Sequence, residues 1–331
     1  MSKIRKLYWF DKKNTDEMIS FLNNRASDTY ISHIMFSPFA PLHHLLPLKF
    51  KFLPESYILE ENKNIKGLIT VAPVKRNQSK MEIQKLFFEE NAYSEATELV
   101  QYVVSKYKAQ GAFSILVKVD SYLPDLLSTF VSKCGFSQIS YEKLWKVNKF
   151  IEKDFDKKDF RIFHNSDSKT VANLYNDSLL PHLRILLNKE AKEYKENIFN
   201  GLSYFSEYKY VIEDKKTTGV VGCIVIRTYD NQNFVVDIIQ TNGIELDIDS
   251  ILAFASYQIK KRKKRFALFV RTKRYTYMGE KYEQYFSEKG YECVQNQILL
   301  TNSSAKIIKE HSKTGKYTII GDFCSSNIMP V

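Results

Sequence analysis

The sequence contains one short pattern twice, and this repeat limits what the chain can fold into. The stretch FVSKCGFSQI ends at Ile139 and the similar stretch YFSEKGYECV ends at Val294, so that Gly290 lies 155 residues after Gly135. A spacing of about 150 residues is the length of an ordinary domain. If the repeat extends beyond these stretches, the chain of 331 residues holds one folding plan twice.

The same spacing holds for the segments that precede the two glycines. GAFSILVKV, from Gly111, matches FALFVRTKR, from Phe266, and both have the β-branched and aromatic residues of a strand. Upstream, SEATELVQYVVSKYKA matches DSILAFASYQIKKRKK, which predicts a helix in each copy with Ser94 and Asp249 as N-caps. Helical spacing predicts the buried positions Ala96, Leu99, Val100, Val103 and Tyr107, and Ile251, Phe254 and Ala255.

A two-residue slip in the spacing falls where a loop is expected. MEIQKL matches VDIIQT at 155 residues and places Glu82 opposite Asp237 on a strand, whereas the strands before them match at 153 residues. The slip lies in the polar stretches KRNQSK and RTYDNQN, and a hairpin loop tolerates such an insertion. A chance match would not keep one register through several elements and then slip in a turn.

Each copy also opens with an extended segment that carries an arginine and an aspartate. IRKLYWFD matches FRIFHNSD at 156 residues, with Arg5 over Arg161 and Asp11 over Asp167. The order in each copy is strand, helical region, hairpin, strand, helix, strand, helix and strand. The first long helix joins two strands by a crossover, so the sheet is mixed.

We therefore predict an α/β chain of two tandem domains, each a mixed, mainly antiparallel sheet flanked by helices. The expected limits are 1–150 and 151–310, followed by a tail, 311–331. The longest uncharged apolar run, GVVGCIVI, is far shorter than the ~20 residues that span a bilayer, so we expect no membrane. The four cysteines show no metal-ligand spacing, which predicts reduced thiols in a cytoplasmic protein and no metal site.

The repeated unit resembles the Gcn5-related N-acetyltransferase (GNAT) superfamily, twice in tandem. The resemblance is carried by the openings IRKLYWFD and FRIFHNSD, by the strands that hold Glu82 and Asp237, and by the endings KCGF and EKGY, and it extends to about Lys306. It implies acetyl-CoA as cofactor and a small-molecule or peptide amine as acceptor. It also implies a loop of Gln or Arg, two residues, Gly, one residue, and Gly or Ala, whose backbone holds the pyrophosphate.

The second copy keeps more of this loop than the first. Gln240 and Gly243 match, but Glu245 stands at the last position and adds negative charge beside the phosphate. The first copy has KLFFEENAYS, without a glycine, so we expect the domain 1–150 to be a degenerate, non-catalytic scaffold. The cofactor-binding residues implied by the resemblance are Ile239, Gln240, Thr241, Asn242, Gly243 and Ser250.

For catalysis, the resemblance implies a base on the strand of Asp237 and a tyrosine four residues before the last glycine. Phe286 occupies that tyrosine position, and Tyr285 is its neighbour, about 100° away around the helix. We assign Asp237 and Tyr285 as candidate catalytic residues. An Asp237 that faces solvent or pairs with a lysine is the alternative.

Three functions are consistent with these features. The first is N-acyl transfer from acetyl-CoA to an amine, and the second is a binding or structural protein whose tandem domains have lost catalysis, a pseudoenzyme. The third is a transferase that uses aminoacyl-tRNA. The run KKRKKR, Lys260–Arg265, would suit nucleic acid in a chain of net charge +11, but cations at a helix C-terminus are the favoured explanation. The sequence does not define the oligomeric state.

Overall fold

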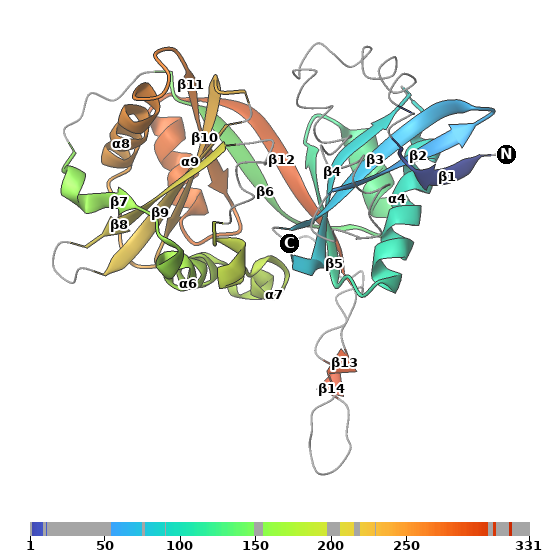
Figure 1. Ribbon diagram of the computed structural model, residues 1–331, viewed down its shortest axis with the longest axis horizontal. Helices are drawn as coiled ribbons and strands as arrows, with labels where there is room; N and C mark the ends of the chain where they lie inside the picture. Colours follow the sequence, from blue (N-terminus) through green and yellow to red (C-terminus); the bar gives the residue numbers. More distant parts are fainter. Residues whose placement is uncertain are drawn as a thin grey trace. The chain divides into compact units, whose positions relative to one another are not determined.

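The computed structural model describes residues 2–8, 11, 54–74, 77–89, 91–148, 155–196, 206–214, 219–228, 230–303, 307–308 and 318–319 (Figure 1). Contacts divide the chain into two compact units. Unit 1 comprises Met1–Ile139 and Leu299–Val331, and unit 2 comprises Ser140–Ile298. Both units are mixed sheets with helices on them, so the predicted fold class is confirmed. The adjacent His43 and His44, which could have suggested a metal pair, lie outside the described residues.

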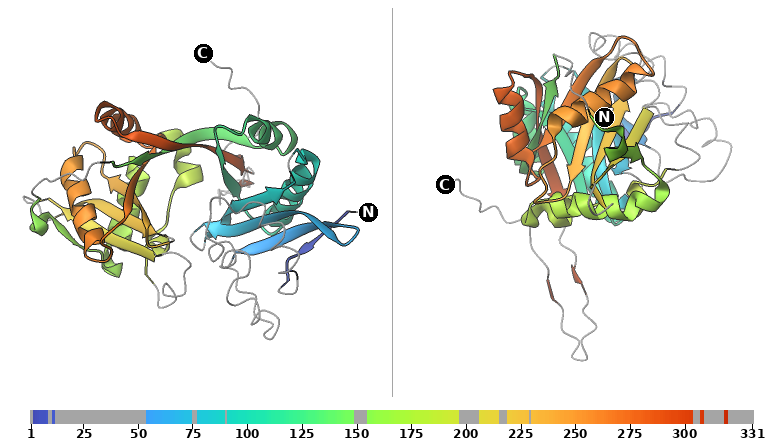
Figure 2. Two further views of the ribbon diagram at one scale, coloured as in Figure 1. Left: turned by 90° about the horizontal axis from the view of Figure 1, so that it is seen from above. Right: turned by 90° about the vertical axis from the view of Figure 1, so that its left-hand side faces the viewer.

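Unit 1 is a sheet covered by one long helix. Its strands follow the order β1-β2-β3-β4-β5-β12, with antiparallel pairs from β1 to β4 and a parallel pair between β4 and β5. Helix α4 packs on β2, β3 and β4 (Figure 2). The elements are β1 (Lys3–Lys6), β2 (Glu55–Glu61), β3 (Asn64–Val74), β4 (Asn77–Phe88), α4 (Tyr93–Ala109), β5 (Ser114–Asp120), α5 (Pro124–Ser128) and the π-helix η2 (Thr129–Lys133).

Unit 2 repeats this plan with additional short helices. Its strands follow the order β6-β11-β10-β9-β8-β7, and the pair of β10 with β11 is parallel, as the pair of β4 with β5 is. The elements are β6 (Ser137–Lys146), β7 (Phe160–Ile162), α6 (Ser168–Ser178), α7 (Arg184–Leu187), β8 (Ser206–Glu213), β9 (Val220–Thr228), β10 (Asn233–Gln240), α8 (Ile248–Lys260), β11 (Ala267–Lys273), α9 (Gly279–Glu288) and β12 (Glu292–Ser303). Single-turn 3₁₀ helices at Lys157–Asp159, Asn165–Asp167, Pro181–Leu183 and Ala191–Glu193, and the short pair β13 (Ile307–Ile308) and β14 (Thr318–Ile319), complete the described elements.

Helices cover both faces of the unit 2 sheet. On one face α8 and α9 bury a large apolar core, in which the Trp145 and Phe286 rings stack with centroids 5.9 Å apart. The Trp145 indole N–H donates to Thr272 Oγ1 at 3.0 Å, which satisfies the one polar group of that ring. On the other face α6 packs on β9 and β10. Side chains alternate along β10, so Asp237 and Ile239 point to the α6 face, away from the core.

The last strand of each repeat is divided between the two units. Residues 137–139 of β6 belong to unit 1 and 140–146 to unit 2, whereas β12 contributes 292–298 to unit 2 and 299–303 to unit 1. In unit 2 the neighbour of β11 is therefore β6, the last strand of the first repeat. The sequence limits 1–150, 151–310 and 311–331 follow the order of the repeats along the chain, whereas contacts group the chain differently.

The two crossover helices confirm the repeat but correct its predicted caps. The buried residues of α4 are the five that were predicted, and those of α8 include Ile251, Phe254 and Ala255. The prediction of Ser94 and Asp249 as N-caps was wrong, because both lie inside their helices. The N-caps are Ala92 and Asp247, which are again 155 residues apart, so both helices begin two residues earlier than expected.

The arginine and aspartate at the start of unit 1 form a partly buried clamp. The Arg5 guanidinium donates to both Asp11 carboxylate oxygens at 2.8 and 2.7 Å, and its Nε donates to Glu60 on β2 at 2.6 Å. The backbone N–H of Tyr8 donates to Asp11 Oδ2 at 2.8 Å. These contacts fix the chain that leaves β1 against the neighbouring strand.

The same clamp recurs in unit 2, residue for residue. The Arg161 guanidinium donates to Asp167 at 2.8 and 3.0 Å and to Glu213 on β8 at 2.5 Å, and the His164 N–H donates to Asp167 Oδ2 at 2.8 Å. The hydrogen bond with Arg161 outweighs burial and lowers the pKa of Asp167. This equivalence of side-chain contacts is stronger evidence for duplication than the sequence match alone.

Asp167→Asn should destabilise the protein by about 1–3 kcal/mol at pH 6, because it weakens charged hydrogen bonds to a buried group. A carboxyl with a lowered folded pKa stabilises the fold above its unfolded pKa and loses this effect as the pH falls. The difference from wild type should therefore shrink below about pH 4.5. Urea unfolding across pH measures it. Asp177→Asn, at an exposed site of α6, is the control and should stay within about 0.5 kcal/mol; a pH-independent difference would contradict the explanation.

Candidate functional site

The strands β10 and β11 part in the middle of the unit 2 sheet. Their parallel register runs from Asn233↔Ala267 to Asp237↔Arg271 and then stops. Beyond this point β10 continues to pair with β9 as far as Gln240, and β11 continues to pair with β6 as far as Lys273. Each strand thus follows its outer neighbour, and the sheet opens between them.

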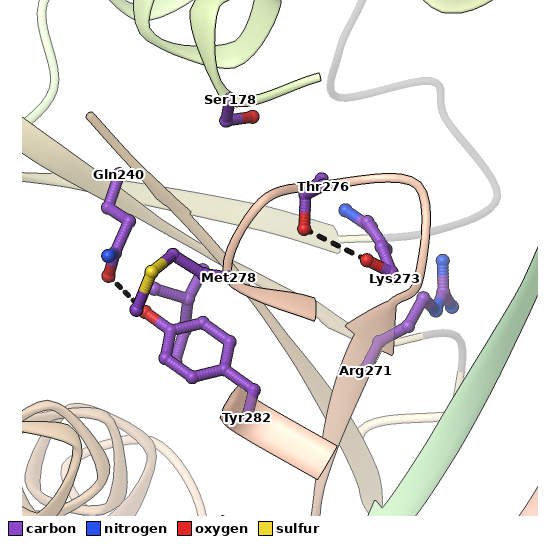
Figure 3. A pocket seen from close by; sticks show the side chains of 8 residues that line it. Ser178, Gln240, Arg271, Lys273, Thr276, Met278 and Tyr282 are labelled. Carbon is purple, nitrogen blue, oxygen red and sulfur yellow. Dashed lines mark hydrogen bonds between the residues drawn. The ribbon is translucent and has the colours of Figure 1, made fainter. Parts of the chain in front are cut away.

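A pocket lies in this opening (Figure 3). Its lining comes from both layers, with Ser178 at the end of α6 on one side and Tyr282 of α9 on the other. The free space is about 20 Å³, which is room for about one water. The remaining lining residues are Ile238, Gln240, Arg271, Lys273, Thr276 and Met278. Arg271 also lines a second small pocket, with Glu142, Lys143, Leu144, Gln295 and Gln297.

Gln240 closes the turn that follows β10. Its side-chain Nε2 donates to the Ile244 carbonyl at 2.9 Å, and its Oε1 accepts from the Tyr282 hydroxyl (Figure 3). The backbone N–H of Thr241 donates to the Val221 carbonyl at 3.1 Å. Gln240 and Thr241, both predicted to bind the cofactor, therefore use their side-chain amide and backbone N–H to hold the loop in shape.

The backbone conformation of this turn favours glycine at position 243. Its φ is +88°, a left-handed conformation that residues with a Cβ adopt at a cost, and a Cβ placed there would meet no atom within 4 Å. Asn242 and Ile244 beside it are exposed. The turn thus presents open backbone next to the N-terminus of α8, a geometry that suits an anion.

Carboxylates already occupy the N-terminus of α8. Asp247 caps the helix by accepting from the Ser250 N–H at 3.4 Å and from the Ser250 hydroxyl at 2.7 Å. Asp249 accepts from the Tyr285 hydroxyl and lies 3.4 Å from Lys289 Nζ. Burial and the bond to Asp249 raise the pKa of Tyr285, which makes its phenol a weaker proton donor. The predicted residues Ser250 and Tyr285 are thus both bound to acids.

Asp237 lies buried among cations on the α6 face. Its Oδ2 lies 2.5 Å from Arg227 and 3.9 Å from Arg271, and its Oδ1 lies 2.7 Å from Lys273 Nζ. Burial alone would raise the pKa of this carboxyl, but the charges of Lys273, Arg271 and Arg227 hold it well below its ordinary value. An acid held ionised in this way is a weak base, so the geometry favours the alternative in which Asp237 pairs with cations.

Sequence reasoning missed the other half of this cluster. Glu142 of β6 is 3% exposed, accepts from the Tyr275 hydroxyl at 2.6 Å and lies 3.7 Å from Arg271. Burial, followed by the charge of Glu142, raises the pKa of Tyr275. Arg271 and Lys273 are two residues apart on β11, so their side chains lie on the same face of the sheet as Asp237. This spacing of cations was the sequence signal that could have predicted the cluster. Nothing in the sequence links Glu142 to them.

The first repeat also opens between its parallel strands, one residue pair later and with different side chains at the opening. The parallel register of β4 with β5 ends at Ile83↔Val117, and burial lowers the pKa of Lys85 just beyond it. The loop that follows has its left-handed residue at Asn91, with φ +65°. Glu89 in this loop pairs with Lys66 at 2.9 Å. An acid thus lies in the loop that corresponds to the turn at Gly243.

Two further kinds of site have no candidate in the described part of the chain. Among these residues no three His, Cys, Asp or Glu side chains come together as a metal site. No helix among them has the length and apolar content needed to cross a membrane.

Comparison with solved structures places the fold. A tandem GNAT protein from the clavulanic acid biosynthesis pathway superimposes with a TM-score of 0.62 at 9% identity, covering 92% of this chain and 98% of that one. A GCN5-related N-acetyltransferase from Sphaerobacter thermophilus gives 0.58 at 8% identity, covering 91% and 95%. The chain has the tandem GNAT fold. No protein-family model and no curated protein matches the sequence.

The cation cluster around Asp237 leads to a stability prediction. Asp237→Asn would leave buried cations without their shared charge and should destabilise the protein by about 3 kcal/mol or more. The double variant Asp237→Asn/Lys273→Met removes one of those cations and should be less destabilised than the sum of the two single variants by about 1 kcal/mol or more. Urea unfolding of the four proteins gives this coupling. Additive effects would show that the two side chains do not interact.

Proposed function

We propose that this protein is an acyl-CoA-dependent N-acyltransferase in which unit 2 binds the acyl donor and unit 1 serves as a scaffold. The observation that carries the proposal is the opening between β10 and β11. The pocket there is lined from both layers of the unit, and one of its lining residues, Gln240, donates to the Ile244 carbonyl of the open turn that precedes α8. The tandem GNAT fold is consistent with this reading, although at 9% identity the likeness supports the fold alone.

In this proposal the backbone of the turn holds the pyrophosphate of the donor. The N–H groups of Asn242 and Gly243 and the first turn of α8 supply donors and a positive helix end. Four residues, Ile239, Gln240, Thr241 and Ser250, act by fixing the turn and the helix start, because their hydrogen bonds are made within the unit. Bound acyl-CoA would supply a thioester, whose carbonyl carbon an amine can attack.

The transfer requires two proton movements. The acceptor amine loses a proton as its nitrogen forms the amide bond, and the thiolate gains one as the C–S bond breaks. The catalytic roles of Asp237 as base and Tyr285 as acid stay predictions. In our proposal Asp237 acts through its fixed negative charge, which holds Lys273 and Arg271 at the pocket. The acceptor is an amine, and a cytoplasmic location remains an expectation.

A second candidate is a tandem-GNAT protein that has lost catalysis. The specific observation in its favour is the acidic start of α8, where Asp247 accepts from the Ser250 N–H, a donor that a phosphate could use, and Asp249 adds a second carboxylate that binds Tyr285. The position of the open Gly243 turn just before the N-terminus of α8 favours the enzyme over this alternative, because backbone N–H groups beside a helix start suit a phosphate.

Calorimetry of the full chain with CoA and acetyl-CoA tests the proposed function. We expect saturable binding, and Gly243→Trp should weaken it at least about tenfold because the indole fills the phosphate space. Gly111→Trp is the matched control, since Gly111 has φ +91° and equally open surroundings in unit 1. It carries the same backbone strain and should bind like wild type. No detectable heat of binding up to millimolar CoA would overturn the proposed donor site and leave the inactive alternative.

The carboxylates around the turn allow a charge test of the same site. Glu245 is 83% exposed at its side chain and lies 3.7 Å from Lys281. Glu245→Gln removes one repulsion from the phosphate and should tighten CoA binding about two- to fivefold at low salt. The gain should fade at 1 M salt, where the Debye length is about 3 Å. Glu288→Gln, an exposed carboxylate at the end of α9, is the control, and an equal gain there would show a general charge effect.

A further inference from the structure

The run Lys260–Arg265 gathers charge at one end of α8. All six of its side chains are exposed. Lys157 joins them, because Lys157 Nζ lies 4.9 Å and Lys261 Nζ 4.3 Å from the centre of one ring, that of Tyr257. We call these seven cations the basic cluster. Hydrogen bonds from Lys261 and Lys157 lower the pKa of Tyr257, which agrees with a positive potential there.

The helix C-terminus accounts for only part of this cluster. Helix α8 ends at Lys260, and the Arg262 side chain donates to the Gln258 carbonyl at 2.8 Å as a cap. The attraction of a helix end for cations falls off within its last turn. Lys263, Lys264 and Arg265 follow that turn. The explanation favoured from the sequence therefore leaves half of the run unexplained.

Several buried or partly buried cations elsewhere in unit 2 have carboxylate partners. Arg161, Arg227, Lys209 and Lys273 each lie within 3.5 Å of a carboxylate oxygen. By contrast, Lys261, Lys263, Lys264 and Arg265 form no ion pair with any residue in the described ranges. Adjacent like charges repel each other in the folded state. A partner that carries negative charge would relieve this repulsion.

The aromatic rings of the cluster favour phosphate contacts over base contacts. The Arg262 guanidinium lies 4.1 Å from the centre of the Tyr208 ring and 3.3 Å from the Tyr210 hydroxyl, so it is fixed in place. Cations thus cover both Tyr208 and Tyr257, and the rings do not offer free stacking platforms of the kind that bind single strands. A duplex exposes only backbone and groove edges, with one charge per about 1.7 Å.

A membrane surface is the less suitable partner. Interfacial anchors combine cations with exposed apolar side chains. The exposed large apolar residues of the described chain are Tyr122, Leu123, Val131, Ile162, Ile185, Ile244, Tyr277 and Val294, and none belongs to the segments 155–159 or 257–266. The cluster therefore offers charge without an anchor.

We propose that the basic cluster binds the phosphate backbone of duplex nucleic acid, without reading its sequence. This surface is separate from the donor site at Gly243, and the proposal does not depend on the proposed acyltransferase activity. It gives the unpaired cations of the α8–β11 turn a function and assigns a partner class to the positive net charge of the chain.

Fluorescence anisotropy with labelled 20-base-pair duplex RNA and duplex DNA tests the proposal, using the full chain between 50 and 200 mM salt. The variant Lys261→Gln/Lys263→Gln/Lys264→Gln/Arg265→Gln should bind at least about tenfold more weakly at 50 mM salt. Its salt slope should fall by about 3–4, since each phosphate contact contributes about 0.9. The variant loses like-charge repulsion, so its thermal unfolding should show a folded protein.

The matched control removes four exposed lysines elsewhere, Lys3, Lys133, Lys169 and Lys195, each changed to glutamine. It has the same net charge and should keep wild-type affinity and slope for the duplexes. Equal losses in both variants would reduce the effect to overall charge and overturn the proposal. Tighter binding of a single strand of the same length, or binding to phosphatidylserine vesicles without binding to either duplex, would also overturn it.

Discussion

The buried charge of Asp237 is the constraint on which the centre of unit 2 depends. A carboxylate that is 1% exposed is stable there only because Arg227, Lys273 and Arg271 surround it. Two of these cations come from β11, at the level where its pairing with β10 ends at Asp237↔Arg271. The Lys273 and Arg271 side chains line the pocket between the separating strands, and that pocket is small. Binding of any substrate there must keep or replace these ion pairs, which ties the chemistry of the pocket to the stability of the unit.

The two repeats show which parts of the plan are constrained by folding. The arginine–aspartate clamp, the parallel register and the starting point of the crossover helix are the same in both units. The opening itself differs, because Glu82 and Lys85 in unit 1 occupy the positions of Asp237 and Gln240 in unit 2. Contacts that close a sheet edge depend on local geometry that both copies share, whereas the groups at the opening differ between the copies.

The sequence was sufficient to predict the repeat, the crossover and the buried face of α4, because these follow from periodic patterns within short segments. It failed at the helix starts, where a shift of two residues separates Ser94 and Asp249 from the true caps. It could not show that Tyr285 binds Asp249 or that Glu142 binds Tyr275, since these pairs are joined by tertiary contacts across 36 and 133 residues. Nor does the order of elements show that β6 lies beside β11, because that depends on which sheet edge a strand finds.

Buried and exposed cations of unit 2 differ in whether they need a carboxylate partner. Where cations are buried or largely buried, at Lys209, Arg227 and Lys273, desolvation favours a carboxylate partner for each, so these groups add little to the external field. Where cations are exposed, solvent screens them and no such pairing is required. The excess charge of the chain must therefore be sought at the surface, and the α8–β11 turn holds its densest run in the sequence. Net charge alone could not identify this turn, because it counts paired and unpaired cations equally; the side-chain partners separate them.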